Sequence, residues 1–88
     1  MSNYEIFWKK SAVKELKSLP KNVASKIISI IDKLQDEPRP SGVKKIEKLK
    51  HHFRLRMNEY RIIYSIEDNK LIIEIIRIGH RKDVYRGI

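Results

Sequence analysis

The last ten residues of the chain combine side chains that are suited to phosphodiester chemistry. Residues 79–88 read Gly-His-Arg-Lys-Asp-Val-Tyr-Arg-Gly-Ile and directly follow the apolar run 71–78. A guanidinium group binds phosphate through paired hydrogen bonds and stays charged at physiological pH. An imidazole titrates near neutrality, and a phenol can stack on a base or donate a proton. This stretch therefore predicts a site that binds and cleaves a phosphodiester.

Cleavage of RNA through its own 2′-hydroxyl group needs three functional groups. A base takes the hydroxyl proton, a cation stabilises the pentavalent transition state, and an acid protonates the leaving oxygen. Arg81 suits the second role, but an arginine is too basic for the first. His80 is the candidate for the base, because an imidazole ordinarily titrates near neutrality, and Tyr85 is the candidate for the acid, because a phenol is a better acid than base. Two plainer interpretations stay open, with His80 as a surface histidine and Tyr85 as a packing residue.

More cations alternate with apolar residues earlier in the chain. The segment 53–57 reads Phe-Arg-Leu-Arg-Met, so Arg54 and Arg56 should stand on one face of a strand and the apolar residues on the other. Arg61 follows a short turn and should lie near them. Like charges this close repel each other unless an anion lies between them. The alternative is a solvated polar face that binds nothing.

The segment 44–52 adds positive charge with little defined geometry. Lysines that contact phosphate position a nucleic acid without reading its sequence, and the candidates for this role are Lys44, Lys45, Lys48 and Lys50. A solvated loop would explain the same residues. The adjacent His51 and His52 lack the spacing of a helical metal-binding pair and have no carboxylate cluster beside them. We therefore expect no metal ion and no other cofactor.

Length and composition limit the kind of protein. The 88 residues predict one domain, 1–88, and 20 lysines and arginines against 11 acidic residues give a net charge of +9. Such a charge attracts polyanions, nucleic acid first, although it also fits solubility alone or an acidic protein partner. The chain has no cysteine, no signal peptide and no apolar run of the roughly 20 residues that a membrane helix needs. We expect a soluble, cytoplasmic protein with no membrane partner.

Hydrophobic periodicity predicts the elements in the first half of the chain. Alternation indicates a strand at 4–8. Helical spacing then indicates a helix capped by Ser11 and a second helix from about Asn22, with Pro20 between them. The prolines within 37–42 end the second helix. Two helices joined this closely form an α-hairpin that must bury one face.

The period then changes from helical spacing to alternation. Strands are predicted at 53–57, 60–66 and 70–78, joined by short turns, which makes an antiparallel meander. Gly79 should end the last strand in a turn that brings His80 and Arg81 close to the open face of the meander. The predicted fold is α+β: an N-terminal strand, an α-hairpin and a three-stranded antiparallel meander that form one sheet with the helices packed on one face.

These residues together resemble the RelE branch of the RelE/ParE superfamily, the toxins of bacterial and archaeal type II toxin–antitoxin pairs. The resemblance extends over essentially the whole chain. It rests on Trp8-x-x-x-Ala12, Leu16-x-x-Leu19, Lys45-x-x-x-Leu49, Phe53-Arg54-Leu55-Arg56, Tyr60-Arg61-Ile62-Ile63-Tyr64, Gly79-His80-Arg81 and Val84-Tyr85. The arginine and tyrosine pattern is the more specific part, and its first half also occurs in relatives with other targets.

The resemblance implies a toxin that cleaves mRNA in the ribosomal A site, with the 2′-hydroxyl as nucleophile and no metal, and so inhibits translation. By position, Arg61 would stabilise the transition state, Arg81 would lie near the leaving group, and Tyr85 would stack on or orient the RNA. Arg54 and Arg56 stand where well-studied members carry two lysines, one of them proposed as the base. Either His80 takes over that role or the activity is low.

The resemblance also implies partners and rival functions. A cognate, RelB-like antitoxin would neutralise the toxin with an acidic or amphipathic segment in a hetero-oligomeric complex, and the ribosome and mRNA would be the targets. A ParE-type toxin of the same fold would instead poison DNA gyrase through protein contacts. A catalytically weak nucleic-acid-binding or interaction module is the third possibility, because the expected lysine base is missing.

Overall fold

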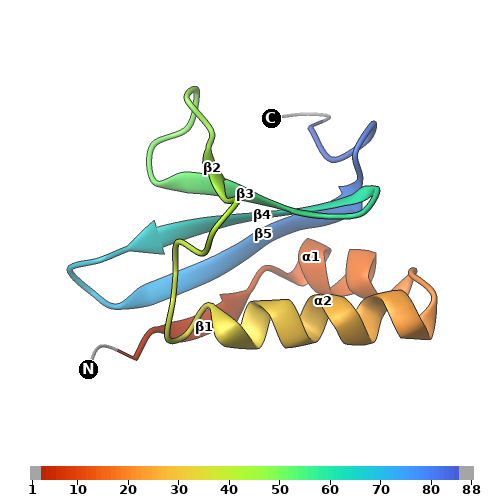
Figure 1. Cartoon of the computed structure of the whole chain (residues 1–88), viewed down its shortest axis with the longest axis horizontal. Helices are drawn as coiled ribbons and strands as arrows, with labels where there is room; N and C mark the ends of the chain where they lie inside the picture. Colours follow the sequence, from red (N-terminus) through yellow and green to blue (C-terminus); the bar gives the residue numbers. More distant parts are fainter. Residues whose placement is uncertain (1–2, 86–88) are drawn as a thin grey trace.

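A five-stranded sheet with two helices on one face makes up residues 3–85, the part of the chain that the computed structural model describes (Figure 1). The strands lie in the order β1-β5-β4-β3-β2, with β1 parallel to β5 and the other neighbours antiparallel. Along the chain the elements are β1 (Glu5–Trp8), α1 (Lys10–Lys17), α2 (Lys21–Lys33), β2 (Lys44–Lys45), β3 (His52–Met57), β4 (Tyr60–Glu67) and β5 (Ile72–His80). The predicted α+β fold with its meander is confirmed. The two-residue strand β2 was not predicted, because two consecutive lysines carry no alternating pattern.

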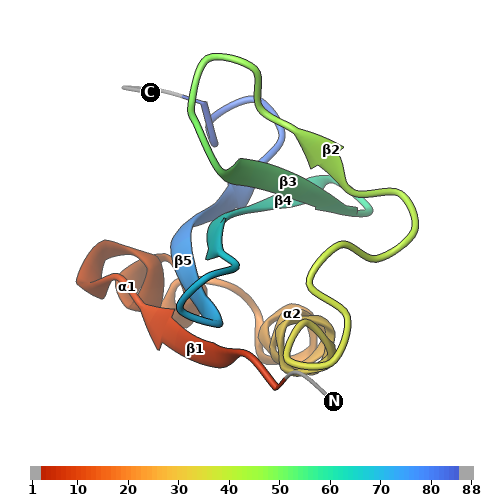
Figure 2. The same ribbon diagram turned by 90° about the vertical axis from the view of Figure 1, so that its left-hand side faces the viewer.

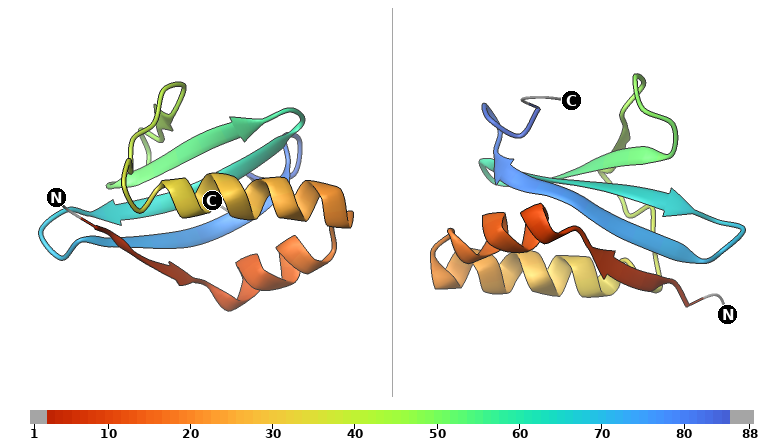
Figure 3. Two further views of the ribbon diagram at one scale, coloured as in Figure 1. Left: turned by 60° about the horizontal axis from the view of Figure 1, so that its bottom comes forward. Right: turned by 180° about the vertical axis from the view of Figure 1, so that it is seen from behind.

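The core lies between the sheet and the helices (Figures 2 and 3). The apolar stripe of α2 supplies Ile27 and Ile31, and Leu34 follows directly after the helix; each is at most 1% exposed. These residues belong to one cluster with isoleucines of β4 and β5 and with the fully buried Tyr64. Ile28 was expected in the same stripe but is 42% exposed, so the buried face of α2 is narrower than the sequence indicated.

The helices begin without side-chain caps. Helix α1 starts at Lys10 and no side chain caps it, so the predicted cap at Ser11 is wrong. The amide of Lys9 instead donates to the carbonyl oxygen of Ile75, 3.0 Å away, and the chain turns out of the sheet before it reaches Ser11. Helix α2 starts directly after Pro20, one residue before the predicted start. Neither helix, within residues 3–85, is long and apolar enough to cross a membrane.

Helix α1 also covers the part of β5 that β1 does not reach. The pairing of β1 with β5 ends at Trp8 and Ile75, which leaves the edge of β5 beyond that point without a strand neighbour. Glu15 of α1 accepts a hydrogen bond from the amide of Ile78 at 2.9 Å. The carboxylate thus takes the place of a missing strand carbonyl and fixes α1 beside the strand that leads to the C-terminal residues.

A β-bulge in β5 decides which of its side chains face away from the helices. Ile63 is paired with Arg77, but the next residue, Tyr64, is paired with Ile75, so one residue of β5 is left over. Ile75 and Ile78 are both buried in the core although three positions separate them. The bulge therefore turns Arg77 to the open face, where strict alternation would have placed it in the core.

Gly79 lies within strand β5, so the prediction that it ends the strand is wrong. It is paired with Arg61 of β4, and the strand continues through His80. Its φ does not lie in the left-handed region, and no turn requires a glycine here. The chain turns after His80, whose carbonyl oxygen accepts a hydrogen bond from the amide of Val84 at 3.0 Å. What Gly79 provides is space rather than a turn.

An ion pair fixes the loop between α2 and β2 to the turn between β4 and β5. Asp68 accepts two hydrogen bonds from the guanidinium of Arg39, at 2.8 and 3.1 Å, and one from the hydroxyl of Tyr4 at 2.7 Å. The same guanidinium lies over the ring of Phe53, 5.2 Å from its centroid. The hydrogen bonds from Arg39 and Tyr4 lower the pKa of Asp68 to about 2.

Replacing Asp68 by asparagine should lower the melting temperature at neutral pH by several degrees, because Arg39 loses its charged partner. The folded-state pKa of about 2 lies below the ordinary value of 3.8. The stabilisation is therefore complete above about pH 4 and disappears as the pH falls towards 2. The difference in melting temperature between the two proteins should shrink over that range. The matched control is Asp32→Asn at an exposed position of α2, and equal melting temperatures for Asp68→Asn and wild type at pH 7 would contradict this role.

Candidate nucleic-acid interface

The open face of the sheet, which the helices do not cover, carries cations in two adjacent rows. Strand register places Arg56 of β3 opposite Arg61 of β4, and Arg61 opposite Gly79 of β5. The neighbouring row, from β2 to β5, consists of Lys44, Arg54, Ile63 and Arg77. Alternation along β3 and the tight turn after it thus bring Arg54, Arg56 and Arg61 to the same face, as the sequence predicted.

Arg61 is a buried cation, with 7% of its surface exposed. Its Nη1 donates to the carbonyl oxygens of Asn58 and Tyr60 at 3.0 and 2.9 Å, which holds the side chain against the β3–β4 turn. Burial lowers the pKa of the Arg61 guanidinium, and the positive charges of Arg56 and other nearby arginines lower it further. An arginine nevertheless stays protonated in proteins. A bound anion is therefore what would relieve this unfavourable charge.

A cavity of about 410 Å³ opens over these arginines. It is lined by Ser41, Gly42, Lys44, Arg54, Leu55, Arg56 and Arg61. The loop residues Ser41 and Gly42 were not predicted to take part. Gly42 has a φ of 89°, in the region that glycine adopts without strain. A Ser-Gly pair directly after Pro40 indicates a sharp turn, and this signal could have placed the loop beside β3.

Tyr85 joins the arginines from the C-terminal side. Its hydroxyl accepts a hydrogen bond from Nη1 of Arg54 at 2.9 Å. The residue remains 38% exposed, so a planar group can still stack on its ring. Only three residues separate Tyr85 from Arg81, and a tight turn over residues 81–85 accommodates this short spacing.

Arg81 is exposed and completes the group of cations. Its amide donates to the carbonyl oxygen of Glu59 at 2.7 Å, which ties the end of β5 to the β3–β4 turn. Its charge is near enough to Arg61 to lower the pKa of that guanidinium. We call Arg54, Arg56, Arg61 and Arg81 the arginine cluster. Arg86, another cation of the predicted C-terminal group, lies outside the described residues.

His80 lies on the helix side of the sheet, so its expected place beside the arginines is wrong. It is paired with Tyr60, and the two rings meet edge to face with centroids 6.2 Å apart. Its Nε2 lies 3.3 Å from a carboxylate oxygen of Glu59. Its pairing partner Tyr60 packs against the core between the helices and the sheet. The physical reason is the bulge in β5, because one extra residue reverses the side on which every later residue stands.

The candidate lysines do not form one group. Lys44 lines the cavity, whereas Lys45, the next residue of β2, is paired with the buried Phe53 and faces the other way. Lys48 and Lys50 lie between β2 and β3, and Lys50 borders a different depression near the β4–β5 turn. Of these lysines, Lys44 therefore adds its charge directly to the arginine cluster.

The cavity is lined by strong phosphate ligands and by no histidine. No carboxylate is among its lining residues, and the ion pairs within residues 3–85 involve other cations. The same residues contain no group of three or more side chains that could hold a metal ion. Guanidinium groups bind phosphate oxygens, and an aromatic ring stacks on a base. The arrangement suits a bound phosphodiester with one neighbouring base stacked on Tyr85.

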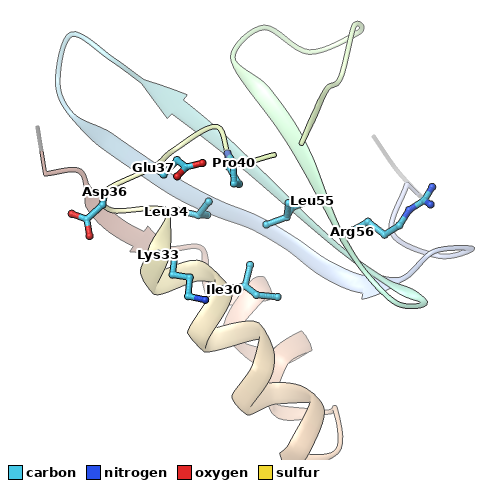
Figure 4. Close-up of a pocket in the computed structure, with 8 residues that line it drawn as sticks. All are labelled: Ile30, Lys33, Leu34, Asp36, Glu37, Pro40, Leu55 and Arg56. Atoms are coloured by element: carbon cyan, nitrogen blue, oxygen red, sulfur yellow. The ribbon is translucent and has the colours of Figure 1, made fainter. Parts of the chain in front are cut away.

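A second depression, of about 430 Å³, lies between the C-terminal end of α2 and β3 and is mainly apolar. Its lining residues are Ile30, Lys33, Leu34, Asp36, Glu37, Pro40, Leu55 and Arg56 (Figure 4). Figure 4 shows Ile30 and Leu34 rising from α2 towards Leu55, while Arg56 extends from β3 in the other direction. Leu55 and Arg56 are adjacent in β3, and Leu55 contributes to the apolar depression while Arg56 belongs to the arginine cluster.

Comparison with known proteins assigns the chain to a protein family. The matching family model is that of the ParE toxin of type II toxin–antitoxin systems, parDE, and it matches residues 6–85. The chain belongs to this family of type II toxins. The matched range contains both helices, the whole meander, the arginine cluster and Tyr85.

Relatives of the toxin carry RelE-type names. Toxin RelG of Mycobacterium tuberculosis is 29% identical over 84 residues, which cover 94% of this chain and 97% of that protein. Toxin RelE3 of Methanocaldococcus jannaschii is 28% identical over 85 residues, which cover 92% and 94%. A chain in the crystal structure of the archaeal RelE–RelB complex from Pyrococcus horikoshii OT3 is 31% identical with a TM-score of 0.81, and the match covers 96% of this chain and all of that one. The toxin is thus RelE-like, as its motifs predicted.

Proposed function

We propose that the toxin is an endoribonuclease that cleaves mRNA in the ribosomal A site and so inhibits translation. The observation that carries this proposal is the convergence of the arginine cluster and Tyr85, because these groups can grip a phosphate and stack on the base beside it. The names of the relatives RelE3 and RelG agree with it. The net charge of +9 would add general attraction to ribosomal and messenger RNA.

In the proposed reaction the RNA supplies its own nucleophile. The 2′-hydroxyl oxygen attacks the adjacent phosphorus, and the bond to the 5′-oxygen of the next nucleotide breaks. One product then ends in a 2′,3′-cyclic phosphate, and the leaving 5′-oxygen takes a proton from water to become the 5′-hydroxyl of the other product. Arg61 stabilises the charge of the pentavalent transition state, Arg81 lies near the leaving oxygen, and Tyr85 orients the RNA. The guanidinium groups supply the positive charge that a metal ion provides in other nucleases.

None of the residues that line the cavity is well suited to accept the proton of the 2′-hydroxyl group. Arg54 and Arg56 are too basic to take a proton from a hydroxyl group. His80 stands on the other side of the sheet, where it faces Glu59 and Tyr60. We therefore expect the hydroxyl proton to pass to water, and the reaction to be slower than with a base in the cavity.

Replacing His80 by glutamine should change the rate of cleavage by less than about tenfold, because removal of a working general base costs about 10²- to 10⁴-fold. The measurement is single-turnover cleavage of mRNA on purified ribosomes across pH 6 to 9. Glu59→Gln is the matched variant, since it removes the partner of His80 without touching the arginine cluster. A loss of about 100-fold or more in His80→Gln alone would restore His80 as the base.

Induced expression of the toxin tests the proposed function. We expect translation to stop and new 5′ ends to appear within ribosome-bound messages. Arg81→Ala is the matched variant, because Arg81 is exposed and its loss should leave the fold intact. Equal cleavage by wild type and Arg81→Ala would contradict the mechanism.

A ParE-type action on DNA gyrase is the second candidate, and the description of the matching family model favours it. It predicts DNA breaks with intact mRNA, so the same induction experiment separates the two functions. A protein that binds RNA or ribosomes and leaves both mRNA and DNA intact would instead be a catalytically weak binding module of the same fold.

We also propose that a cognate, RelB-like antitoxin neutralises the toxin in a hetero-oligomeric complex. Structures of relatives from Pyrococcus horikoshii and Methanococcus jannaschii are complexes of RelE with RelB. An acidic or amphipathic segment would offset the net charge of +9. Co-expression with the product of the adjacent reading frame should yield a complex in size-exclusion chromatography and relieve the block of translation. Continued toxicity with no complex would argue against that partner.

A further inference from the structure

Val84 is buried on the open face, apart from the main core. It is 1% exposed but does not belong to the cluster between the helices and the sheet. It lies directly over Gly79: a Cβ atom added there would stand 3.9 Å from Cα, Cβ and Cγ2 of Val84. Gly79 thus leaves open the space that Val84 fills, and any side chain larger than a methyl group at position 79 would compete for it.

Arg77 holds the same residue through its backbone. Nη1 of Arg77 donates to the carbonyl oxygen of Val84 at 3.1 Å. The amide of Val84 donates to the carbonyl oxygen of His80 at 3.0 Å. Both backbone polar groups of the residue before Tyr85 are therefore bonded to β5. Tyr85 then leaves a fixed point, and its hydroxyl reaches Arg54 at 2.9 Å.

We propose that Val84 and Arg77 are positioning residues that place Tyr85 over the arginine cluster, and that Gly79 leaves the space in which Val84 packs. The bulge in β5 is part of this arrangement, because it turns Arg77 and Gly79 to the open face. The inference rests on the proposed function, in which Tyr85 orients RNA. A tyrosine in a loop beyond the last strand would otherwise have to be ordered by the RNA itself, at a cost in affinity and rate.

A direct measurement of the position of Tyr85 tests the proposal without any activity. The protein is labelled with 3-fluorotyrosine, and the ¹⁹F resonance of Tyr85 is assigned with Tyr85→Phe. Gly79→Val and Val84→Ala should move this resonance to its value in the urea-unfolded chain, while the other tyrosine resonances stay in place. Gly79→Ala is the matched control and should leave it unchanged, because its Cβ would make an ordinary contact. An unmoved Tyr85 resonance in both Gly79→Val and Val84→Ala would overturn the proposal.

A double-mutant cycle on cleavage tests whether Val84 acts through Tyr85. Val84→Ala should slow ribosome-dependent cleavage by about 10- to 100-fold, and Val84→Ile, which keeps the contact with Gly79, should restore most of the rate. In a Tyr85→Ala background, Val84→Ala should cause no further loss. Independent, multiplying losses would overturn the positioning role. If the wild-type toxin cleaves no RNA, the proposed function fails, and the ¹⁹F measurement still decides the position of Tyr85.

Discussion

Replacing Arg61 by methionine should reduce mRNA cleavage on ribosomes by about 10²- to 10³-fold while the protein stays folded. Arg61 is the buried member of the arginine cluster, and its neighbours and the β3–β4 turn fix its position. A preorganised charge of this kind stabilises the transition state without reorganisation at the moment of reaction. The loss should therefore lie in the single-turnover rate at saturating toxin rather than in ribosome affinity. The measurement is a cleavage time course on ribosomes that carry a defined mRNA.

The thermal stability of the same variant should not fall together with its activity. Burial and neighbouring positive charges disfavour the charged form of Arg61 in the folded protein, and methionine keeps the apolar stem without the charge. We expect a melting temperature equal to or above that of the wild type. Lys14→Met, at an exposed position of α1, removes the same charge far from the cavity and should cleave normally. A tenfold or smaller loss of cleavage in Arg61→Met would remove Arg61 from the chemistry.

The sequence alone was sufficient to predict that Arg54, Arg56 and Arg61 share one face of the sheet. Alternation along 53–57 assigns Arg54 and Arg56 to one face because consecutive residues of a strand point in opposite directions. The tight turn that follows fixes the register of β3 against β4, so that Arg61 lies opposite Arg56. The apolar residues of the same strand then have no place but the helix side. Local patterns decide each of these steps, and no distant contact is needed.

The C-terminal part depended on a feature that local patterns do not reveal. In the run Ile75-Ile76-Arg77-Ile78, either set of alternate residues could face the core. The residue left unpaired in the bulge decides which set does. Because the bulge reverses the faces, His80 goes to the helix side and Arg77 to the open side. The charge of Arg77 within an isoleucine-rich run was the available signal, since a buried guanidinium without a partner would be costly there.

The second large expected effect is a gain of activity when a weaker base is placed in the cavity. Replacing Arg56 by lysine should speed cleavage at least about tenfold, because a general base contributes about 10²- to 10⁴-fold and an arginine cannot serve as one. Arg56 lines the cavity and stands opposite Arg61. Nearby positive charges lower the pKa of an amine placed there, which raises the fraction that is neutral near pH 7.

The dependence of this gain on pH separates a base from a mere change of shape. The neutral amine is the active form, so the rate of Arg56→Lys should rise with pH until the lysine pKa is reached and then level off. The wild-type rate should lack that titration. Arg56→Gln loses the charge without gaining a base and should not exceed the wild type. If Arg56→Lys is no faster than the wild type at any pH from 6 to 9, position 56 does not hold the proton acceptor. The same substitution at Arg54 would then be the comparison of interest, although it also disturbs the hydrogen bond to Tyr85.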